Sequence, residues 1–239
     1  MSDVLFVDVE TVGESHPGHG RLLMVGWAVN DEPAHVHTLG SLEDVGVHDE
    51  WVKHLANPRT VAVSHTLYDA RWFTHGGYQV KGEWHDTRVM AWCISENTPL
   101  DLDWLTEHYV PHARKEKLLH PRAGIVYFSY GGENSDHGEW PLTTYDEWPE
   151  HVKAAFRDYN AGDVESLREL YKELLRGMRE AEVYTYWRDE ELPFTPILIA
   201  MERNGLPIDL EKCAALTTAI QAKRSDAEKG LRRLARLPR

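Results

Sequence analysis

Hydrophobic and polar positions near the N-terminus follow the two-residue period of β-strands. Val4–Glu10 alternates and is rich in β-forming residues, which predicts a buried strand. A turn-rich loop at residues 16–20 separates it from a second predicted strand at Arg21–Asn30, and a shorter strand follows at His35–Leu39. Thr60–Ser64 is a short apolar run that predicts another strand. Short turns between the first three strands favour an antiparallel meander that precedes parallel crossovers.

Helical periodicity, interrupted by Pro and Gly, dominates the remainder of the chain. Residues 111–149 are broken repeatedly by Pro and Gly, and they predict an irregular insertion with a small hairpin at Ile125–Tyr130. Gly162 lies inside the longest predicted helix and is expected to weaken or bend it. The predicted helices are His48–Ala56, Tyr68–Thr74, Thr87–Ile94, Asp101–Tyr109, Glu150–Arg176, Leu192–Arg203 and a last one from about Leu210. This order of strands and helices predicts an α/β fold around a mixed sheet.

The composition favours a protein without a membrane span. The chain has 239 residues, of which 42% are hydrophobic, and it contains no long apolar run. Its N-terminus enters a strand directly and lacks the basic and apolar regions of a signal peptide. Its two cysteines, Cys93 and Cys213, are too few for a disulfide framework, which indicates a reducing compartment. We therefore expect a cytoplasmic protein of one or two domains.

The formal net charge of −13 limits how the chain binds nucleic acid. The last 20 residues hold seven Lys or Arg and only two acidic residues, a local +5 that leaves −18 on the remainder. A broad duplex-binding groove needs a basic face, which such a surface lacks. An enzyme that holds a few nucleotides through metal ions has no such requirement. The charge therefore argues against tight independent DNA binding and leaves hydrolysis open.

Four acidic residues in three separated segments, Asp8, Glu10, Asp69 and Asp163, carry the candidate chemistry. Strand alternation places Asp8 and Glu10 on one face of the first strand, about 6–7 Å apart. Burying carboxylates is costly unless a cation pairs with them. Oxygen ligands favour Mg²⁺ or Mn²⁺ over zinc, and two such cations held by shared carboxylates support phosphodiester hydrolysis. The pattern predicts a metal-dependent nuclease, although an Asp-x-Glu pair also occurs by chance at a solvated strand edge.

Tyr159 and Asp163 are four residues apart, so they share a face of the predicted helix. A phenol beside a metal-bound carboxylate can hydrogen-bond an attacking water and orient it. A buried Tyr next to a surface Asp is the alternative interpretation of this spacing.

Together these segments resemble the DEDDy 3′–5′ exonucleases, a superfamily that includes the proofreading domains of family A DNA polymerases and RNase D. The resemblance covers about residues 3–176. Its three motifs correspond to Asp8-x-Glu10-Thr11, Tyr68-Asp69 and Tyr159-x-x-x-Asp163. The fold that it implies is ribonuclease H-like, with a mixed five-stranded sheet flanked by helices. His65 stands where members often carry Asn, and a histidine can titrate near neutrality.

The resemblance also implies a mechanism with two divalent ions, Mg²⁺ or Mn²⁺. It assigns one metal to Asp8, Glu10 and Asp163, with the attacking water aligned by Tyr159 and Glu10. A second metal shares Asp8, with Asp69 acting through water. Thr11, His65 and Tyr68 are the expected substrate-binding residues. The implied substrate is a single-stranded or frayed 3′ DNA end, and the implied product is a nucleoside 5′-monophosphate.

Residues 191–209 resemble the helix and turn that open the polymerase part of family A DNA polymerases. This similarity predicts an exonuclease domain at 1–185 and a helical segment at 186–239 that starts a polymerase region. Polymerisation itself is not expected, because nothing resembling fingers or palm follows. Exposed apolar side chains such as Leu198 and Met201 suggest a partner for 191–239, namely a separately encoded polymerase subunit. A solvated basic helix is the alternative.

Three functions remain open from the sequence. The first is a DNA-proofreading 3′–5′ exonuclease of a bacterial or phage replication system. The second is an RNase D-like RNA exonuclease with the same site. The third is a non-catalytic docking module of a split polymerase, against which the presence of all four acids and Tyr159 argues. Trp72 or Trp84 is a candidate for stacking on a nucleic-acid base.

Overall fold

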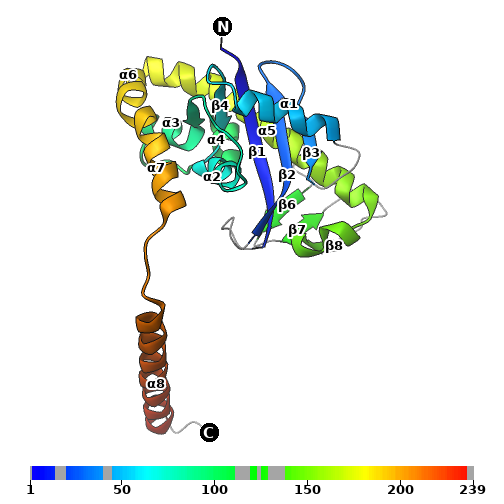
Figure 1. Cartoon of the computed structure of the whole chain (residues 1–239). Coiled ribbons are helices and arrows are strands. Elements are labelled where there is room, and N and C mark those ends of the chain that lie inside the picture. Colours follow the sequence, from blue (N-terminus) through cyan, green and yellow to red (C-terminus); the bar gives the residue numbers. More distant parts are fainter. Residues whose placement is uncertain are drawn as a thin grey trace. The chain divides into compact units, whose positions relative to one another are not determined.

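A five-stranded mixed sheet forms the centre of the larger part of the molecule (Figure 1). The computed structural model describes residues 2–13, 20–39, 45–110, 119–122, 125–128 and 138–235. The strands are β1 (Val4–Gly13), β2 (Gly20–Val29), β3 (His35–Thr38), β4 (Val61–Ser64) and β5 (Trp84–Asp86). Their order is β3-β2-β1-β4-β5, with antiparallel β3-β2-β1 pairing and parallel β1-β4-β5 pairing. The predicted antiparallel meander and mixed five-stranded sheet are therefore confirmed.

Alternation along β1 divides the core between the two faces of the sheet. Leu5, Val7 and Val9 pack in one hydrophobic cluster with buried residues of the helices α1 (Val45–Leu55) and α2 (Leu67–His75). Phe6 packs in the other cluster, together with residues of the helices α3 (Thr87–Ile94), α4 (Leu102–Tyr109) and α5 (Glu150–Glu180). Because successive strand side chains point to opposite faces, Asp8 and Glu10 share the face of Phe6, which α5 covers.

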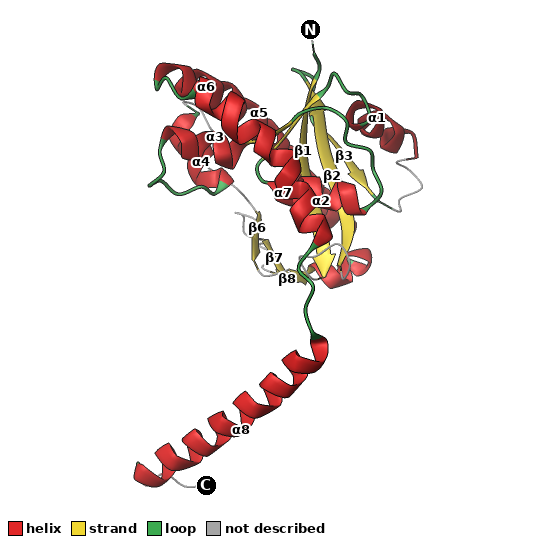
Figure 2. Ribbon diagram, turned by 60° about the vertical axis from the view of Figure 1, so that its left-hand side comes forward, coloured by secondary structure: helices red, strands yellow, loops and turns green. Residues whose placement is uncertain are grey.

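Helices cover both faces of this sheet, as Figures 1 and 2 show, with α1 and α2 on one face and α3, α4 and α5 on the other. The chain continues after α5 with α6 (Tyr184–Tyr186), a π-helical turn η2 (Trp187–Glu191), α7 (Leu192–Asn204) and α8 (Leu210–Leu234). Side-chain oxygens cap the starts of four helices, since Thr66, Asp86, Asp101 and Asp209 accept hydrogen bonds from the first turns of α2, α3, α4 and α8. Such caps satisfy backbone N–H groups that the helix leaves unpaired.

Two local predictions differ from the structure. Helix α5 runs without interruption for 31 residues through Gly162, which is expected to weaken or bend it. Gly162 is exposed, and its helical neighbours on either side are held by burial against the sheet, which outweighs the low helix propensity of one glycine. The fifth strand, β5, was not recognised from the sequence because it has only three residues.

The predicted insertion at 111–149 contains more regular structure than expected. A three-stranded antiparallel sheet has the order β6 (Leu119–Arg122), β7 (Ile125–Phe128) and β8 (Gly138–Pro141). A 3₁₀ helix η1 (Leu142–Glu147) follows it. The predicted hairpin at Ile125–Tyr130 corresponds to the middle strand of this sheet, and its last two residues lie outside the described part of the chain.

By packing, the chain divides into two compact units, Met1–Arg203 and Asn204–Arg239. The first includes Trp187, which is buried against the rings of His85 and Tyr184, and Ile199, which packs on the core beside α2. The second contains α8, in which no residue is buried. The functional boundary at residue 185 stays a prediction. None of the described helices is long and apolar enough to cross a membrane.

Candidate metal centre and nuclease site

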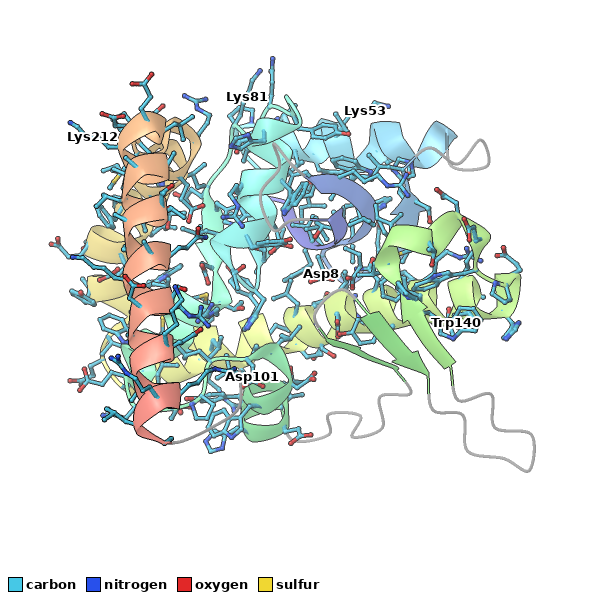
Figure 3. All side chains as sticks on the ribbon, turned by 90° about the horizontal axis from the view of Figure 1, so that it is seen from below. Asp8, Lys53, Lys81, Asp101, Trp140 and Lys212 are labelled. Atoms are coloured by element: carbon cyan, nitrogen blue, oxygen red, sulfur yellow. The ribbon has the colours of Figure 1, made fainter. Side chains whose placement is uncertain are left out.

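Strand β1 and helix α5 bring three of the predicted carboxylates together. Asp8 and Glu10 come from β1, Asp163 comes from α5, and one oxygen of each lies within 4.8 Å of the others. Figure 3 labels Asp8 in the region between the strands and α5. Asp163 is buried, whereas Asp8 and Glu10 are half-buried, so the cluster is partly exposed to solvent. An all-oxygen, multiply charged donor set without thiol or imidazole fits a hard divalent cation.

Tyr159 stands one helical turn before Asp163 and is hydrogen-bonded to its carboxylate. Its ring stacks on Phe156, with the ring centroids 6.1 Å apart. Burial, followed by the charges of Asp163 and Glu10, raises the pKa of the Tyr159 hydroxyl far above its ordinary value. The phenol therefore stays protonated and is a hydrogen-bond donor at the edge of the carboxylate cluster.

Asp69 lies in the first turn of α2 and is anchored to β1 rather than joined to the cluster of three. Pairing between β4 and β1 ends at Phe6, which leaves the N–H of Val9 without a strand partner. The Oδ1 atom of Asp69 accepts a hydrogen bond of 3.0 Å from this N–H. Full burial, with a further contribution from the charge of Asp86, raises the pKa of Asp69 to about 7. The fourth predicted acid thus lies beside the strand that carries Asp8 and Glu10.

Thr11 and Tyr68 form a second link between β1 and α2. The Thr11 Oγ1 and Tyr68 hydroxyl oxygens are 2.6 Å apart. The register of β1 against β2 shifts between Glu10 and Thr11, which is a local irregularity in the strand. Such irregularities re-aim side chains at the ends of strands. The contact thus joins Thr11, which follows Glu10 in β1, to Tyr68, which precedes Asp69 in α2.

His65 is held by hydrogen bonds at both ring nitrogens. Its Nδ1 atom is 3.0 Å from Thr87 Oγ1, and its Nε2 atom is 2.9 Å from the carbonyl oxygen of Leu100. A carbonyl only accepts, so Nε2 donates to Leu100. The one proton of the Thr87 hydroxyl has two acceptors within reach, Nδ1 of His65 and the carbonyl oxygen of Ser64 at 3.3 Å. Burial lowers the pKa of His65 to about 4. The neutral ring is therefore favoured near neutral pH, because desolvation disfavours the charged form.

Asn160 is a site residue that the sequence interpretation missed. It is 0% exposed, and its Nδ2 atom donates a hydrogen bond of 2.7 Å to Asp8 Oδ2. Asn160 occupies a buried stripe of α5 together with Phe156 and Val164. A polar residue at helical spacing within an apolar stripe was the available signal.

A pocket of about 430 Å³ adjoins the site beside α2 and α3. Its lining includes Tyr68, Arg71, Arg88 and Trp92. Trp92 is 41% exposed, whereas Trp72 and Trp84, the predicted stacking candidates, are buried. Those two rings offer no free face to a base, because strand and helix packing encloses them in the core. Trp92 is the tryptophan that the pocket leaves accessible.

The sheet order and its flanking helices define a ribonuclease H-like fold, as found in exonucleases. No model of a known protein family matches the chain. DNA polymerase I of Borreliella burgdorferi is 21% identical over 156 residues, which cover 65% of this chain and 15% of that protein. The similarity is weak, and it agrees with the predicted resemblance to the exonuclease domain of DNA polymerase I-like proteins.

Two solved structures show the same fold at low sequence identity. The POL domain of Pol1 from M. smegmatis, in complex with DNA primer-template and dNTP, has a TM-score of 0.63 and 13% identity, covering 98% of this chain and 34% of that one. Brucella melitensis NrnC has a TM-score of 0.61 and 16% identity, covering 86% and 87%. NrnC is also known with bound Mg²⁺ and bound to pGG. The chain therefore spans about a third of Pol1 and most of NrnC.

Proposed function

We propose that this chain is a metal-dependent 3′–5′ exonuclease that shortens DNA from its 3′ end and releases nucleoside 5′-monophosphates. The observation that carries the proposal is the meeting of Asp8, Glu10 and Asp163 within 4.8 Å on an exonuclease-like fold. The sequence match to a DNA polymerase I favours DNA as the substrate and proofreading as the role.

Each predicted site residue has a role that its position supports. Asp8, Glu10 and Asp163 would hold Mg²⁺ or Mn²⁺, and Asp69 would support a second ion through water. Two such ions supply Lewis acidity and lower the pKa of bound water. The Tyr159 hydroxyl, protonated beside Asp163, orients the attacking water together with Glu10. Thr11 and Tyr68 bind the terminal nucleotide, while His65 positions the segment around Thr87 and Leu100.

The pocket beside α2 and α3 supports a path for the nucleotides that precede the 3′ end. Trp92 provides an accessible aromatic face, on which any base can stack. Arg71 and Arg88 place two guanidinium groups in a lining that also holds Asp86, Glu191 and Glu202, and the Arg71 guanidinium lies 3.9 Å from the Glu202 carboxylate. Binding of a phosphate oxygen by Arg71 would therefore replace this ion pair. A short path of this kind agrees with an acidic protein that holds few nucleotides.

The direct test is degradation of a 5′-labelled single-stranded DNA oligonucleotide with Mg²⁺ or Mn²⁺. We expect a ladder that shortens from the 3′ end and disappears with EDTA, with Asp8→Ala and with Asp163→Ala. Asp158→Ala, which changes an exposed acid on the same helix, should keep wild-type activity. Absence of cleavage combined with absence of Mn²⁺ binding in calorimetry refutes the proposal. Activity that survives both site substitutions refutes the assigned residues.

A second candidate substrate is a very short oligonucleotide. It is favoured by the similarity to NrnC, because the match covers 87% of the NrnC chain. The match to DNA polymerase I covers only 15% of that protein. The NrnC structure with pGG makes this compound the natural probe. Measuring kcat/KM for pGG, for a longer RNA and for a DNA of the same sequence as that RNA distinguishes these candidate substrates. A preference for RNA or for pGG above tenfold would replace the DNA assignment.

A docking role for residues 191–239 remains a separate proposal. Helix α8 exposes apolar side chains along its length, among them Leu216, Ile220 and Leu231. In α7, Met201 is exposed as predicted, whereas Leu198 is half-buried. A separately encoded polymerase subunit is the partner that the sequence suggests. Co-elution in size-exclusion chromatography with such a subunit, lost on removal of 204–239, tests it independently of cleavage.

A further inference from the structure

The contact between Asn160 and Asp8 joins α5 to the middle of β1. An Asp carboxylate at neutral pH only accepts hydrogen bonds, so the amide must present its Nδ2 atom to Asp8. The amide orientation is therefore set by its partner. The 2.7 Å distance is that of a charge-assisted hydrogen bond, which is about twice as strong as a neutral one. The Oδ2 atom of Asp8 is thereby held in place.

Gly26 of β2 makes room for this amide. In the β1–β2 register Gly26 lies opposite Asp8, on the strand next to it. A Cβ atom at position 26 would lie 2.4 Å from Asn160 Oδ1 and 2.8 Å from a methyl group of Val164. Separations below 3 Å are not tolerated, so any side chain at this position displaces Asn160 or α5. A glycine and a buried asparagine, 134 residues apart in sequence, thus form one unit with Asp8.

Asn160 keeps this geometry at an energetic cost. Its Oδ1 atom is buried and has no hydrogen-bond partner among the described residues. An unsatisfied buried polar atom costs about 1–3 kcal/mol. An apolar side chain would fill the same place on the stripe of Phe156 and Val164 without that cost. Packing alone therefore does not account for an asparagine here, whereas orientation of Asp8 does.

We propose that Asn160 is a positioning residue that holds the Asp8 carboxylate in the orientation needed to bind a divalent cation, and that Gly26 is required for this contact. The inference rests on the proposed metal-dependent function, since Asp8 is its central ligand. Partners that orient metal ligands typically contribute 10- to 100-fold to metal affinity or activity. Asn160 itself touches neither substrate nor metal in this assignment.

The test measures Mn²⁺ binding by isothermal titration calorimetry in the wild type, Asn160→Ala, Gly26→Ala and the double variant. We expect Asn160→Ala to weaken Mn²⁺ binding by roughly 10- to 100-fold. Gly26→Ala should do the same, because its methyl group displaces the amide. The double variant should bind as weakly as Asn160→Ala and no weaker, since both changes remove the same contact. Asp158→Ala is the control on α5 and should bind as the wild type does.

Different results separate this inference from the proposed function. Wild-type affinity in Asn160→Ala overturns the positioning role while leaving the nuclease intact, even if that variant melts at a lower temperature. Additive losses in the double variant overturn the link between Gly26 and Asn160. If Asn160→Ala does not fold, Asn160→Leu carries the measurement, because leucine fills the place on the stripe of Phe156 and Val164 and likewise removes the amide donor to Asp8. A wild type that binds no Mn²⁺ refutes the proposed function itself.

Discussion

At the scale of single residues, burial decides which protonation state each polar side chain near the site keeps. Tyr159 stays protonated because its ring is desolvated and faces carboxylates. His65 stays neutral because its ring is buried between Thr87 and the Leu100 carbonyl. Asp69 is shifted toward its protonated form by the same desolvation. The same physical cause thus acts in opposite directions on acids and on bases.

Tyr159→Phe tests the contribution of the Tyr159 hydroxyl separately from that of the ring. The phenylalanine keeps the stacking on Phe156 and removes only the donor beside Asp163. Because a positioned proton donor contributes about 10²-fold or more, we expect kcat to fall by roughly 10²-fold with little change in Mn²⁺ affinity. Single-turnover cleavage and calorimetry measure the two quantities. A kcat within twofold of the wild type would exclude a role for the hydroxyl in the chemical step.

His65→Asn should change how stability depends on pH. The pKa of His65 is about 4 in the folded state and near 6.5 when unfolded, so the unfolded chain binds more protons between these values. The contribution is complete above pH 6.5 and is lost as the pH falls toward 4 and below. Relative to His65→Asn, the wild type should lose on the order of 2–3 kcal/mol of unfolding free energy between pH 7 and pH 4.

Urea unfolding of both proteins at a series of pH values in EDTA measures this difference. Other titrating groups are common to the two proteins and cancel in the comparison. Parallel stability curves over this range would show that His65 is readily protonated in the folded protein, against the burial argument.

At the scale of elements, the site depends on β1 and α5 lying against each other in one register. The two-residue period of β1 points Asp8 and Glu10 toward α5, and the helical period of α5 points Tyr159 and Asp163 back at them. Helix α2 completes the arrangement, because the early end of β4 leaves a backbone N–H for Asp69. Helix α3 contributes the accessible pocket wall.

Trp92→Ala on α3 tests the proposed strand path. Stacking of one base on an aromatic ring contributes about 1–3 kcal/mol, so KM for single-stranded DNA should rise about tenfold while kcat is retained. Lys53→Ala, which removes an exposed cation on α1, is the control, since α1 and α3 pack on opposite faces of the sheet. An unchanged KM in Trp92→Ala would place the strand elsewhere on the surface.

At the scale of the whole molecule, the two compact units differ in how much they bury. In Met1–Arg203, Trp187 is 2% exposed, and it packs against His85 at a centroid distance of 4.9 Å. In Asn204–Arg239, α8 buries no residue among those described. Packing therefore extends the first unit past residue 185. The boundary predicted at residue 185 marks where the similarity to a polymerase begins, and it does not refer to packing.

Two truncations distinguish these boundaries. A chain ending at Arg203 should melt within about 2 °C of the full chain, because it loses no buried side chain. A chain ending at Thr185 loses Trp187, and removing a buried Trp costs about 3–5 kcal/mol, which corresponds to a decrease in Tm of roughly 10 °C. Circular dichroism melts measure both. Equal melting temperatures for the two truncations would show that the segment after residue 185 does not stabilise the fold.

The sequence by itself determined the features that depend on local periodicity and on residue chemistry. Strand alternation predicted the shared face of Asp8 and Glu10, and helical spacing predicted that of Tyr159 and Asp163. The order of strands and helices predicted the mixed sheet, which the structure confirms. These properties are local, since they follow from the geometry of a single strand or helix.

Only the tertiary structure decided the features that join distant segments. The Asn160–Asp8 hydrogen bond spans 152 residues and needs Gly26 on a third segment, so no local pattern reveals it. Burial assigned the low pKa of His65, enclosed Trp72 and Trp84, and left Trp92 accessible. Packing also keeps α5 continuous through Gly162, where local propensity predicts a weakened or bent helix. Desolvation and close approach depend on which segments meet in space, and this is fixed by the assembled fold.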